Sequence, residues 1–269
     1  MSRLFPREYF FPVQHKALLK QLIRRDIQQR FRGSWLGLGW ALITPMAMLA
    51  VYTFVFRTVL NARWPGAEDS NTEFALQIFS GLMIFSLFSE IVSRAPLLVV
   101  SQPNMVKKVI FPLEILPWVS AASSFFYTMA SLVVLLLAVA VVRESVAVSF
   151  LAIPFVLLAF LPLLLGFSWL LAALGVYLRD ISHIVGLILT PMLFLSPVFY
   201  PVTALPEIVQ DLMLLNPLTV IIEAFRACLL DGRWPDFYML TAYGATGVIV
   251  ARFGAWCFDR TRKGFADVL

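Results

Sequence analysis

The sequence predicts an all-α integral membrane protein built as a bundle of six transmembrane helices, with little or no soluble domain. Of its 269 residues, 60% are hydrophobic and only 14% are charged, whereas about a quarter of the residues of a soluble domain are charged. The charges lie in clusters, and several uncharged stretches between them exceed the roughly 18 residues that mark a candidate membrane span. Because several stretches reach this length, the prediction does not depend on a single segment.

An amphipathic helix is expected before the first span, at residues 14–31. Leu19, Ile23 and Ile27 repeat every four residues, and basic and amide side chains fill the other face. An apolar stripe opposite a basic face is typical of a helix that lies in the headgroup plane of a membrane. The alternative is a helix of a soluble tail that packs on a partner. We interpret residues 1–33 as a cytoplasmic, interfacial segment.

Six spans follow, each bounded by charged or turn-forming residues. We expect them at residues 35–56, 74–88 with a continuation towards 98, 115–142, 148–177, 184–199 and 238–258. Pro154 and Pro162 predict a broken fourth span, because a proline inside a helix removes a backbone hydrogen bond. Gly247, Ala251 and Ala255 lie on one face of the last span, which permits close approach of another helix. Ordinary use of small residues in a span explains them equally well.

The connection between the fifth and sixth spans, residues 200–235, has a different composition. It holds four prolines, and its apolar pieces at 212–215 and 218–230 are too short to cross a bilayer. We expect two short re-entrant helices that return on the same side. Glu223 and Arg226 are three residues apart and could simply pair with each other.

The Lys and Arg residues predict the orientation of the bundle. Most of them lie on the side of the chain that holds the N-terminus, so both termini are expected in the cytoplasm. The chain has no internal repeat or linker and is expected to form one domain over residues 1–269. Residues 34–258 form its bundle and 259–269 a cytoplasmic tail. Cys228 and Cys257 are placed near opposite faces of the membrane, so no disulfide is expected.

Motifs of enzymes are missing from this sequence. It has no GxxxxGK[ST] loop for ATP, no HExxH or GxSxG pattern, and no Cys/His cluster with metal-ligand spacing. Carboxylates inside the spans are scarce, which argues against an ion-coupled transporter and for an external energy source. The basic residues flank apolar spans, a placement typical of membrane topology rather than of nucleic-acid binding. We expect no enzymatic activity and no cofactor or metal in this chain.

An ordered set of short motifs carries a resemblance to a known family. They are RRDI at 24–27, RFRGSWLG at 30–37, Trp40 and Pro45, YLRDI at 177–181, SPVFYP at 196–201 and LNPL at 215–218. Taken in order over nearly the whole chain, they resemble the membrane subunit of type-2 ABC exporters. The resemblance is to the polysaccharide-export branch, which moves O-antigen, capsule or teichoic-acid chains.

The resemblance implies partners and a location. It implies a homodimer in the bacterial inner membrane that works with two copies of a separate nucleotide-binding ATPase, which holds ATP and Mg²⁺. It implies a glycan linked to polyprenyl pyrophosphate as substrate, and a role in lipopolysaccharide or related polymer biosynthesis. Two alternatives stay open, namely an ABC permease that exports a drug or a lipid, and a membrane scaffold without transport activity.

Arginines and glycines before the first span are candidates for binding the pyrophosphate of the lipid carrier. Arg25, Arg30 and Arg32 lie at the end of the amphipathic helix, and the arginine fork matches phosphate oxygens. Gly33 and Gly37 would let a headgroup approach the backbone. In the alternative interpretation, these arginines only set the orientation of the chain and attract anionic lipid.

Aromatic side chains are candidates for lining a glycan channel, since they offer a flat apolar face together with a polar edge. The candidates are Trp35, Trp40, Tyr52, Phe56, Phe199 and Tyr200. Aromatic residues also form belts at the membrane interface and face lipid.

The polar segment between the second and third spans is a candidate for ATPase coupling. It is expected on the cytoplasmic side, and its candidate residues are Ser101, Gln102, Asn104 and Lys107. A loop that only sets topology is the alternative.

Overall fold

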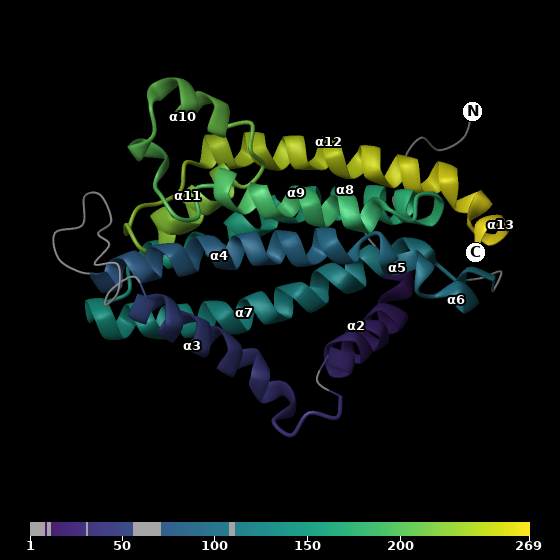
Figure 1. Cartoon of the computed structure of the whole chain (residues 1–269), viewed down its shortest axis with the longest axis horizontal. Helices are drawn as coiled ribbons and strands as arrows, with labels where there is room; N and C mark the ends of the chain where they lie inside the picture. The colour runs from purple at the N-terminus through teal and green to yellow at the C-terminus, as the bar shows by residue number, and fades with distance from the viewer. Residues whose placement is uncertain (1–8, 10–11, 31, 56–70, 108–110) are drawn as a thin grey trace.

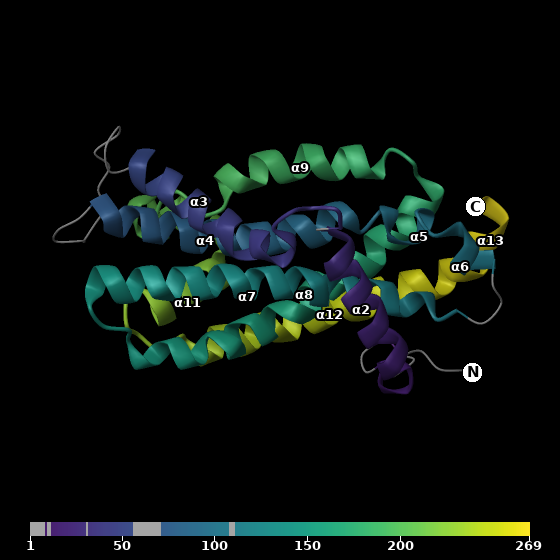
Figure 2. The ribbon, with the colours of Figure 1, turned by 90° about the horizontal axis from the view of Figure 1, so that it is seen from below.

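The computed structural model describes residues 9, 12–30, 32–55, 71–107 and 111–269 (Figure 1). Every regular element within these ranges is helical, which confirms the all-α fold class. Most of the long helices run side by side along the long axis of the molecule. The oblique helix α2, Lys16–Arg30, lies across one side of them (Figures 1 and 2).

Three stretches of the described chain are long and apolar enough to cross a membrane. They are Glu73–Arg94, Leu113–Arg143 and Val148–Tyr177. Their helices are α4 (Asn71–Arg94), α7 (Leu116–Arg143) and α8 (Ile153–Tyr177), with 3-10 turns leading into the last two. These three match the second, third and fourth predicted spans. The helices at the first and fifth spans are shorter, α3 at Trp40–Thr53 and α9 at Ile181–Leu195, and α12 at Phe237–Thr261 matches the sixth in position.

The predicted break in the fourth span is wrong. Helix α8 runs without interruption through Pro162, and Pro154 lies in its first turn. A proline in the first turn removes no hydrogen bond, because the first backbone N–H groups of a helix have no partner within it. Around Pro162, α12 offers a glycine: a Cβ on Gly247 would come within 3.5 Å of the Pro162 side chain. Helix α8 packs along α12, and such packing compensates for the one backbone hydrogen bond that an internal proline removes from a membrane helix.

Small residues bring α8 and α12 into backbone contact. A Cβ placed on Gly166 of α8 would lie 2.6 Å from the backbone nitrogen of Ala251, and one on Gly254 of α12 would meet the carbonyl oxygen of Gly166. Ala251 and Ala255 are buried. The predicted close approach at Gly247, Ala251 and Ala255 is therefore confirmed, and Gly254, next to Ala255, takes part in it.

The predicted amphipathic helix before the first span is confirmed as α2, and its apolar stripe is partly covered by protein. Leu22 is buried against Ile115 and Val119, at the start of α7. The hydroxyl of Tyr127, further along α7, donates to the carbonyl oxygen of Ile27 at 3.2 Å. Helix α2 is thus docked on the bundle.

Two short helices occupy the region after α9, as expected. They are α10, Glu207–Met213, and α11, Thr219–Leu229. The first begins earlier than the predicted 212–215, directly after Pro206, with Glu207 in its first turn, where a carboxylate is favourable. Between them, the Asn216 side chain donates to the carbonyl oxygen of Leu195 at 3.1 Å and accepts from the Leu218 N–H at 2.9 Å. The side-chain amide thereby bonds backbone groups at the end of α9 and the start of α11, where helical partners are lacking.

Arg226 of α11 does much more than pair with Glu223. Its side chain is only 3% exposed, and the Glu223 carboxylate lies 3.4 Å away. The guanidinium donates to the carbonyl oxygens of Pro197 at 2.5 Å, Val198 at 2.7 Å and Gln77 at 2.9 Å. It therefore ties α11 to α4 and to the irregular segment after α9, where backbone groups would otherwise lack donors. The sequence predicted only the pair with Glu223, and the structure adds these three carbonyl contacts of Arg226.

Arg143, the last residue of α7, makes a second link at the same end of the bundle. Its guanidinium binds the Glu73 carboxylate of α4 and the carbonyl oxygen of Leu230.

Both cysteines are free thiols, with Cys228 buried and Cys257 half-buried, which confirms the expected lack of a disulfide.

We predict that Gly254→Val destabilises the bundle, because a branched side chain at this position collides with the backbone of α8. Overpacking of this kind costs about 1–3 kcal/mol or more. The apparent melting temperature of the purified protein in detergent should fall by several degrees, in proportion to that cost. Gly186→Val in α9 is the matched control, since a Cβ there meets no atom within 4 Å. Equal shifts in both variants would contradict the close contact.

We also predict that Arg226→Met lowers stability strongly. The substitution keeps most of the apolar stem but leaves the three carbonyl oxygens without this donor, at a cost of about 3 kcal/mol or more. Arg233→Met is the control, since the Arg233 side chain is 75% exposed and pairs with Asp231 at the surface. Thermal unfolding monitored by size-exclusion chromatography compares them. A control variant as unstable as Arg226→Met would refute the prediction.

Candidate functional site

A cavity of about 340 Å³ lies between α3, α4 and α7, under the end of α2. Its wall combines a charged pair with aromatic rings and hydroxyl groups. Six of the residues that line it are Arg30, Glu90, Trp40, Tyr52, Tyr127 and Ser131. The structure thus brings together three residues that the sequence singled out separately, Arg30 as a phosphate ligand and Trp40 and Tyr52 as channel aromatics.

Arg30 is held in place by groups of the bundle. Its Nη1 donates to Oε1 of Glu90 at 2.6 Å, and its Cζ lies 4.2 Å from the centre of the Tyr127 ring. A planar guanidinium suits both contacts, because it stacks on an aromatic face while it donates in its own plane. Any anion that reaches Arg30 must compete with the Glu90 carboxylate.

Further charges tie α2 to the end of α4. Arg94 donates to both oxygens of Asp26, at 2.8 and 3.0 Å, and its Nη1 lies 3.6 Å from Glu90. Asp26, Arg94, Glu90 and Arg30 therefore alternate in sign along one row. Their side chains are between 22% and 48% exposed, so each pair contributes at most about 1 kcal/mol. The row fixes the position of α2 more than it stabilises the fold.

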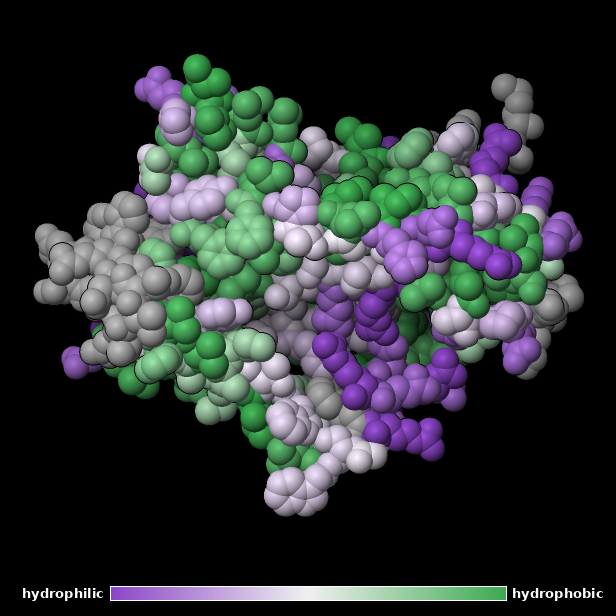
Figure 3. Space-filling view, viewed as in Figure 1, coloured by the Kyte–Doolittle hydropathy of each residue, from purple (hydrophilic) through white to green (hydrophobic). Residues whose placement is uncertain are grey.

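The other predicted phosphate ligands lie on the surface and do not line the cavity. Arg25 and Arg32 are exposed, and hydrophilic side chains gather in the region of α2 (Figure 3). Gly33 and Gly37 adopt positive φ angles of 83° and 51°, and no atom lies within 4 Å of a Cβ built on either. Only glycine adopts this backbone readily, and here the chain turns from α2 towards α3. The five residues are neighbours in sequence but do not form one closed pocket.

The remaining aromatic candidates are dispersed. Trp35 is 96% exposed. Phe199 stacks on Phe194 of α9 with ring centres 5.6 Å apart, and the Tyr200 hydroxyl donates to the Phe194 carbonyl oxygen at 2.8 Å. These two residues fold back on α9 and do not line the cavity. Phe56 lies outside the described residues.

The candidate coupling segment forms two short helices at the end of the bundle opposite α11. They are α5, Leu97–Val100, and α6, Pro103–Lys107, beside the C-terminal α13, Phe265–Val268 (Figure 1). Ser101 and Asn104 are exposed, and Gln102 is half-buried. A Cβ on Gly175 of α8 would collide with the Pro96 backbone, so this segment is seated directly on α8. The polar residues of this segment therefore lie at one end of α8.

Sequence reasoning missed the residues that hold α2, namely Asp26, Glu90, Arg94 and Tyr127. One signal was present, since Glu90 and Arg94 are spaced i, i+4, as helical ion pairs are. The pairing with Asp26 and Arg30 joins residues 60 and 68 positions apart, and no local pattern shows it. Within the described residues, no three His, Cys, Asp or Glu side chains are grouped to hold a metal ion.

Comparison with known proteins places this helical bundle in a family. The sequence profile of the ABC-2 type transporter family matches residues 17–230, from the second residue of α2 through the end of α11. The chain therefore belongs to the ABC-2 type transporter family, and it is an integral membrane protein of that class.

Full-length relatives carry more specific names. The chain is similar to the O-antigen export system permease protein RfbA of Myxococcus xanthus, with 29% identity over 94% of this chain and 96% of the relative. An RfbA of Klebsiella pneumoniae is 22% identical over 94% and 95% of the two chains. The polysialic acid transport protein KpsM of Escherichia coli is 23% identical over 94% and 96%. The similarity thus extends over nearly the whole of both proteins in each case.

We predict that Arg94→Ala loosens α2 from the bundle, because it removes the partner of Asp26 and one partner of Glu90. A cysteine introduced at the buried Leu22 should react with a maleimide several-fold faster in the Arg94→Ala background, as expected for a loss of about 1 kcal/mol. Arg25→Ala, at an exposed arginine of the same helix, should leave the rate unchanged. Equal rates in all three backgrounds would mean that the charges do not hold α2.

Proposed function

We propose that this chain is the membrane subunit of an ATP-driven exporter that moves a lipid-linked polysaccharide from the cytoplasm across the inner membrane. The observation that carries this proposal is the end-to-end similarity to permeases named for O-antigen export and polysialic acid transport. The cavity supports it, because a cation beside aromatic rings suits a ligand that joins phosphate to sugar.

The assembly we propose is a homodimer of six-span subunits with both termini in the cytoplasm. Helices α3 and α9 lie on the side of the bundle away from α12 (Figure 2). They expose large apolar side chains, including Met46, Leu187 and Phe194. These faces are suited to a second subunit as well as to lipid. In this arrangement α10 and α11 are re-entrant and lie at the outer end.

Energy for transport comes in this proposal from two copies of a separate ATPase, which bind ATP and Mg²⁺. The sequence contains no phosphate-binding loop of its own. The α5–α6 segment, with Ser101, Gln102, Asn104 and Lys107, is the docking element. Its seating on α8 at Gly175 supports this role, since a movement of the segment is passed directly to this long apolar helix.

Arg30 receives the pyrophosphate in this proposal, with Arg25 and Arg32 on the path to it. A diphosphate that binds Arg30 displaces Glu90, which keeps Arg94 as a partner 3.6 Å away. Trp40 and Tyr52 then face the first sugars from the wall of the cavity. Trp35, Phe56, Phe199 and Tyr200 remain candidates for other parts of the path.

Deletion of the gene followed by complementation tests the function. Without the chain, lipid-linked glycan should accumulate on the cytoplasmic side and surface polysaccharide should disappear, and the wild-type gene should restore export. Arg30→Lys combined with Arg32→Lys should restore at most about a tenth of it, because lysine cannot form the paired hydrogen bonds of arginine.

Arg260→Lys is the control, since Arg260 is an exposed residue at the end of α12. All variants are compared at equal membrane levels. Full export by the double lysine variant would leave the arginines only an orienting role. If the deletion strain kept normal surface polysaccharide but retained a drug or a lipid in the cell, the exported substrate would be that compound and not a glycan.

A further inference from the structure

The C-terminal tail folds back against the bundle. It continues from α12 as a 3-10 turn, Arg262–Gly264, and the short helix α13. The Phe265 side chain is fully buried. Its ring meets the ring of Phe258 in α12 edge to face, with the centres 5.4 Å apart, and its centre lies 6.1 Å from that of the Tyr177 ring at the end of α8. One aromatic side chain of the tail thus joins the ends of α8 and α12.

Tyr177 also fixes the backbone of the tail. Its hydroxyl donates to the carbonyl oxygen of Thr261 at 2.9 Å. The last carbonyl groups of a helix lack partners within it, so this bond also satisfies the end of α12. A Cβ on Gly264 would lie 2.6 Å from the same hydroxyl oxygen, which leaves no room for a side chain there. The tail therefore has one defined path across the end of α8.

An ion pair ties the tail to the start of α7. Nη1 of Arg262 donates to Oε2 of Glu114 at 2.9 Å, and Glu114 is only 7% exposed. A buried carboxylate needs such a partner, because an unpaired charge in a dry interior is costly. The backbone carbonyl oxygen of Glu114 accepts the indole N–H of Trp169 in α8 at 3.1 Å. The tail, α7 and α8 are therefore joined at one point.

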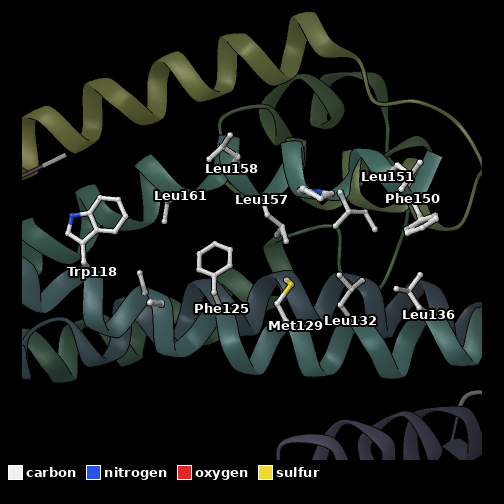
Figure 4. Close-up of a pocket in the computed structure, with 14 residues that line it drawn as sticks. Trp118, Phe125, Met129, Leu132, Leu136, Phe150, Leu151, Leu157, Leu158 and Leu161 are labelled. Atoms are coloured by element: carbon white, nitrogen blue, oxygen red, sulfur yellow. The ribbon is translucent and has the colours of Figure 1, made fainter. Parts of the chain in front are cut away.

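Tyr9 joins the same set of contacts. Its hydroxyl donates to Oδ1 of Asp259 at 3.2 Å. Its ring centre lies 5.8 Å from that of Trp169 and 6.3 Å from that of Phe258. The indole N–H of Trp118 donates to the Tyr9 carbonyl oxygen at 2.7 Å, and Trp118 lies at one end of an apolar groove of about 500 Å³ between α7 and α8 (Figure 4). The contacts around the tail thus involve α7, α8, α12 and Tyr9.

The α5–α6 segment rests in part on this tail. Helices α6 and α13 are in contact at the end of the bundle (Figures 1 and 2). Met105 and Val106 of α6 are half-buried and pack against the apolar core that includes Phe265, whereas Ser101 and Asn104 are exposed. A helix of five residues is not stable by itself in water. The position of α6 therefore depends on the surface beneath it, and the tail forms part of that surface.

We propose that Phe265 is a positioning residue for ATPase coupling, because the C-terminal tail holds α6 against the bundle and joins it to α12. The proposal rests on the proposed function for the role of the α5–α6 segment as the docking element. A movement of α6 then reaches α12 through the tail as well as α8 through Gly175. An intact tail is therefore required for coupling, whether or not the tail touches the ATPase.

Amide hydrogen exchange of the purified full-length chain in nanodiscs, followed by mass spectrometry, tests the position of α6. Phe265→Ala removes a fully buried ring and should speed exchange in residues 101–107 by about tenfold or more. Phe265→Leu keeps most of the apolar volume and should stay within about threefold of the wild type. Val268→Ala is the matched control, because Val268 of the same helix is 46% exposed. Unchanged exchange of α6 in Phe265→Ala would overturn the proposal.

Exchange in α11, at the opposite end of the bundle, reports on the whole fold and should be the same in all variants. If Phe265→Ala exposes α11 as well, Gly264→Ala decides, since its Cβ displaces the tail from Tyr177 and leaves every buried side chain in place. Faster exchange confined to α6 would support the proposal, and unchanged exchange of α6 would overturn it. Gly186→Ala, where a Cβ meets no atom within 4 Å, is the control for this variant.

ATP hydrolysis shows whether the position of α6 matters for the ATPase. The tagged chain is purified from the membranes of its native cell, and hydrolysis is measured per mole of chain. The rate should fall about fivefold or more in Phe265→Ala and recover in Phe265→Leu, because apparent affinity falls with the fraction of chains whose α6 is in place. Full hydrolysis together with a loosened α6 would overturn the coupling role. No hydrolysis with the wild-type chain would instead remove the export proposal, and the exchange result alone would then decide whether the tail holds α6.

Discussion

The backbone contact between α8 and α12 is the constraint on which the rest of the bundle depends. Gly166 and Gly254 have no side chains, so the two helices meet at the distance of their main chains. Within a membrane, where lipid is as apolar as leucine, such close contact is a main source of helix association. Helix α8 then serves as the support for α11, for the turn at Pro96 through Gly175, and for one wall of the apolar groove.

Polar interactions place the remaining elements against this pair. At one end, the buried Arg226 supplies donors to carbonyl groups where the chain leaves regular helices. At the other end, Asp26, Arg94, Glu90 and Arg30 dock α2 on α4. The first set is buried and is important for stability, since unsatisfied carbonyls in a dry interior are costly. The second is partly exposed, so its pairs can exchange partners, which suits the anion binding that we propose at Arg30.

Much of the fold could be predicted from local sequence, and less of the site. The spans at α4, α7 and α8 follow from hydrophobic length, and α2 follows from its period, because both patterns are local properties. The predicted break at Pro162 was wrong because the loss of one backbone hydrogen bond is tolerated where a membrane helix packs against its neighbours, and no local pattern shows that α8 packs along α12. The sequence predicted Arg30 as a phosphate ligand and Trp40 and Tyr52 as channel aromatics, but nothing in it showed that the three share one cavity.

The sequence by itself determined that this is a helical membrane protein, where most of its helices lie, and that it carries no ATP-binding loop of its own. These properties depend on composition and on short motifs, which the chain carries whatever its conformation. Only the tertiary structure decided the partners of Arg30 and Arg226, the dispersal of Phe199 and Tyr200 from the cavity, and the groove between α7 and α8. The reason is physical: ion pairs, cavities and grooves form between segments far apart in the chain, and their geometry is set when helices pack at distances that their small residues allow.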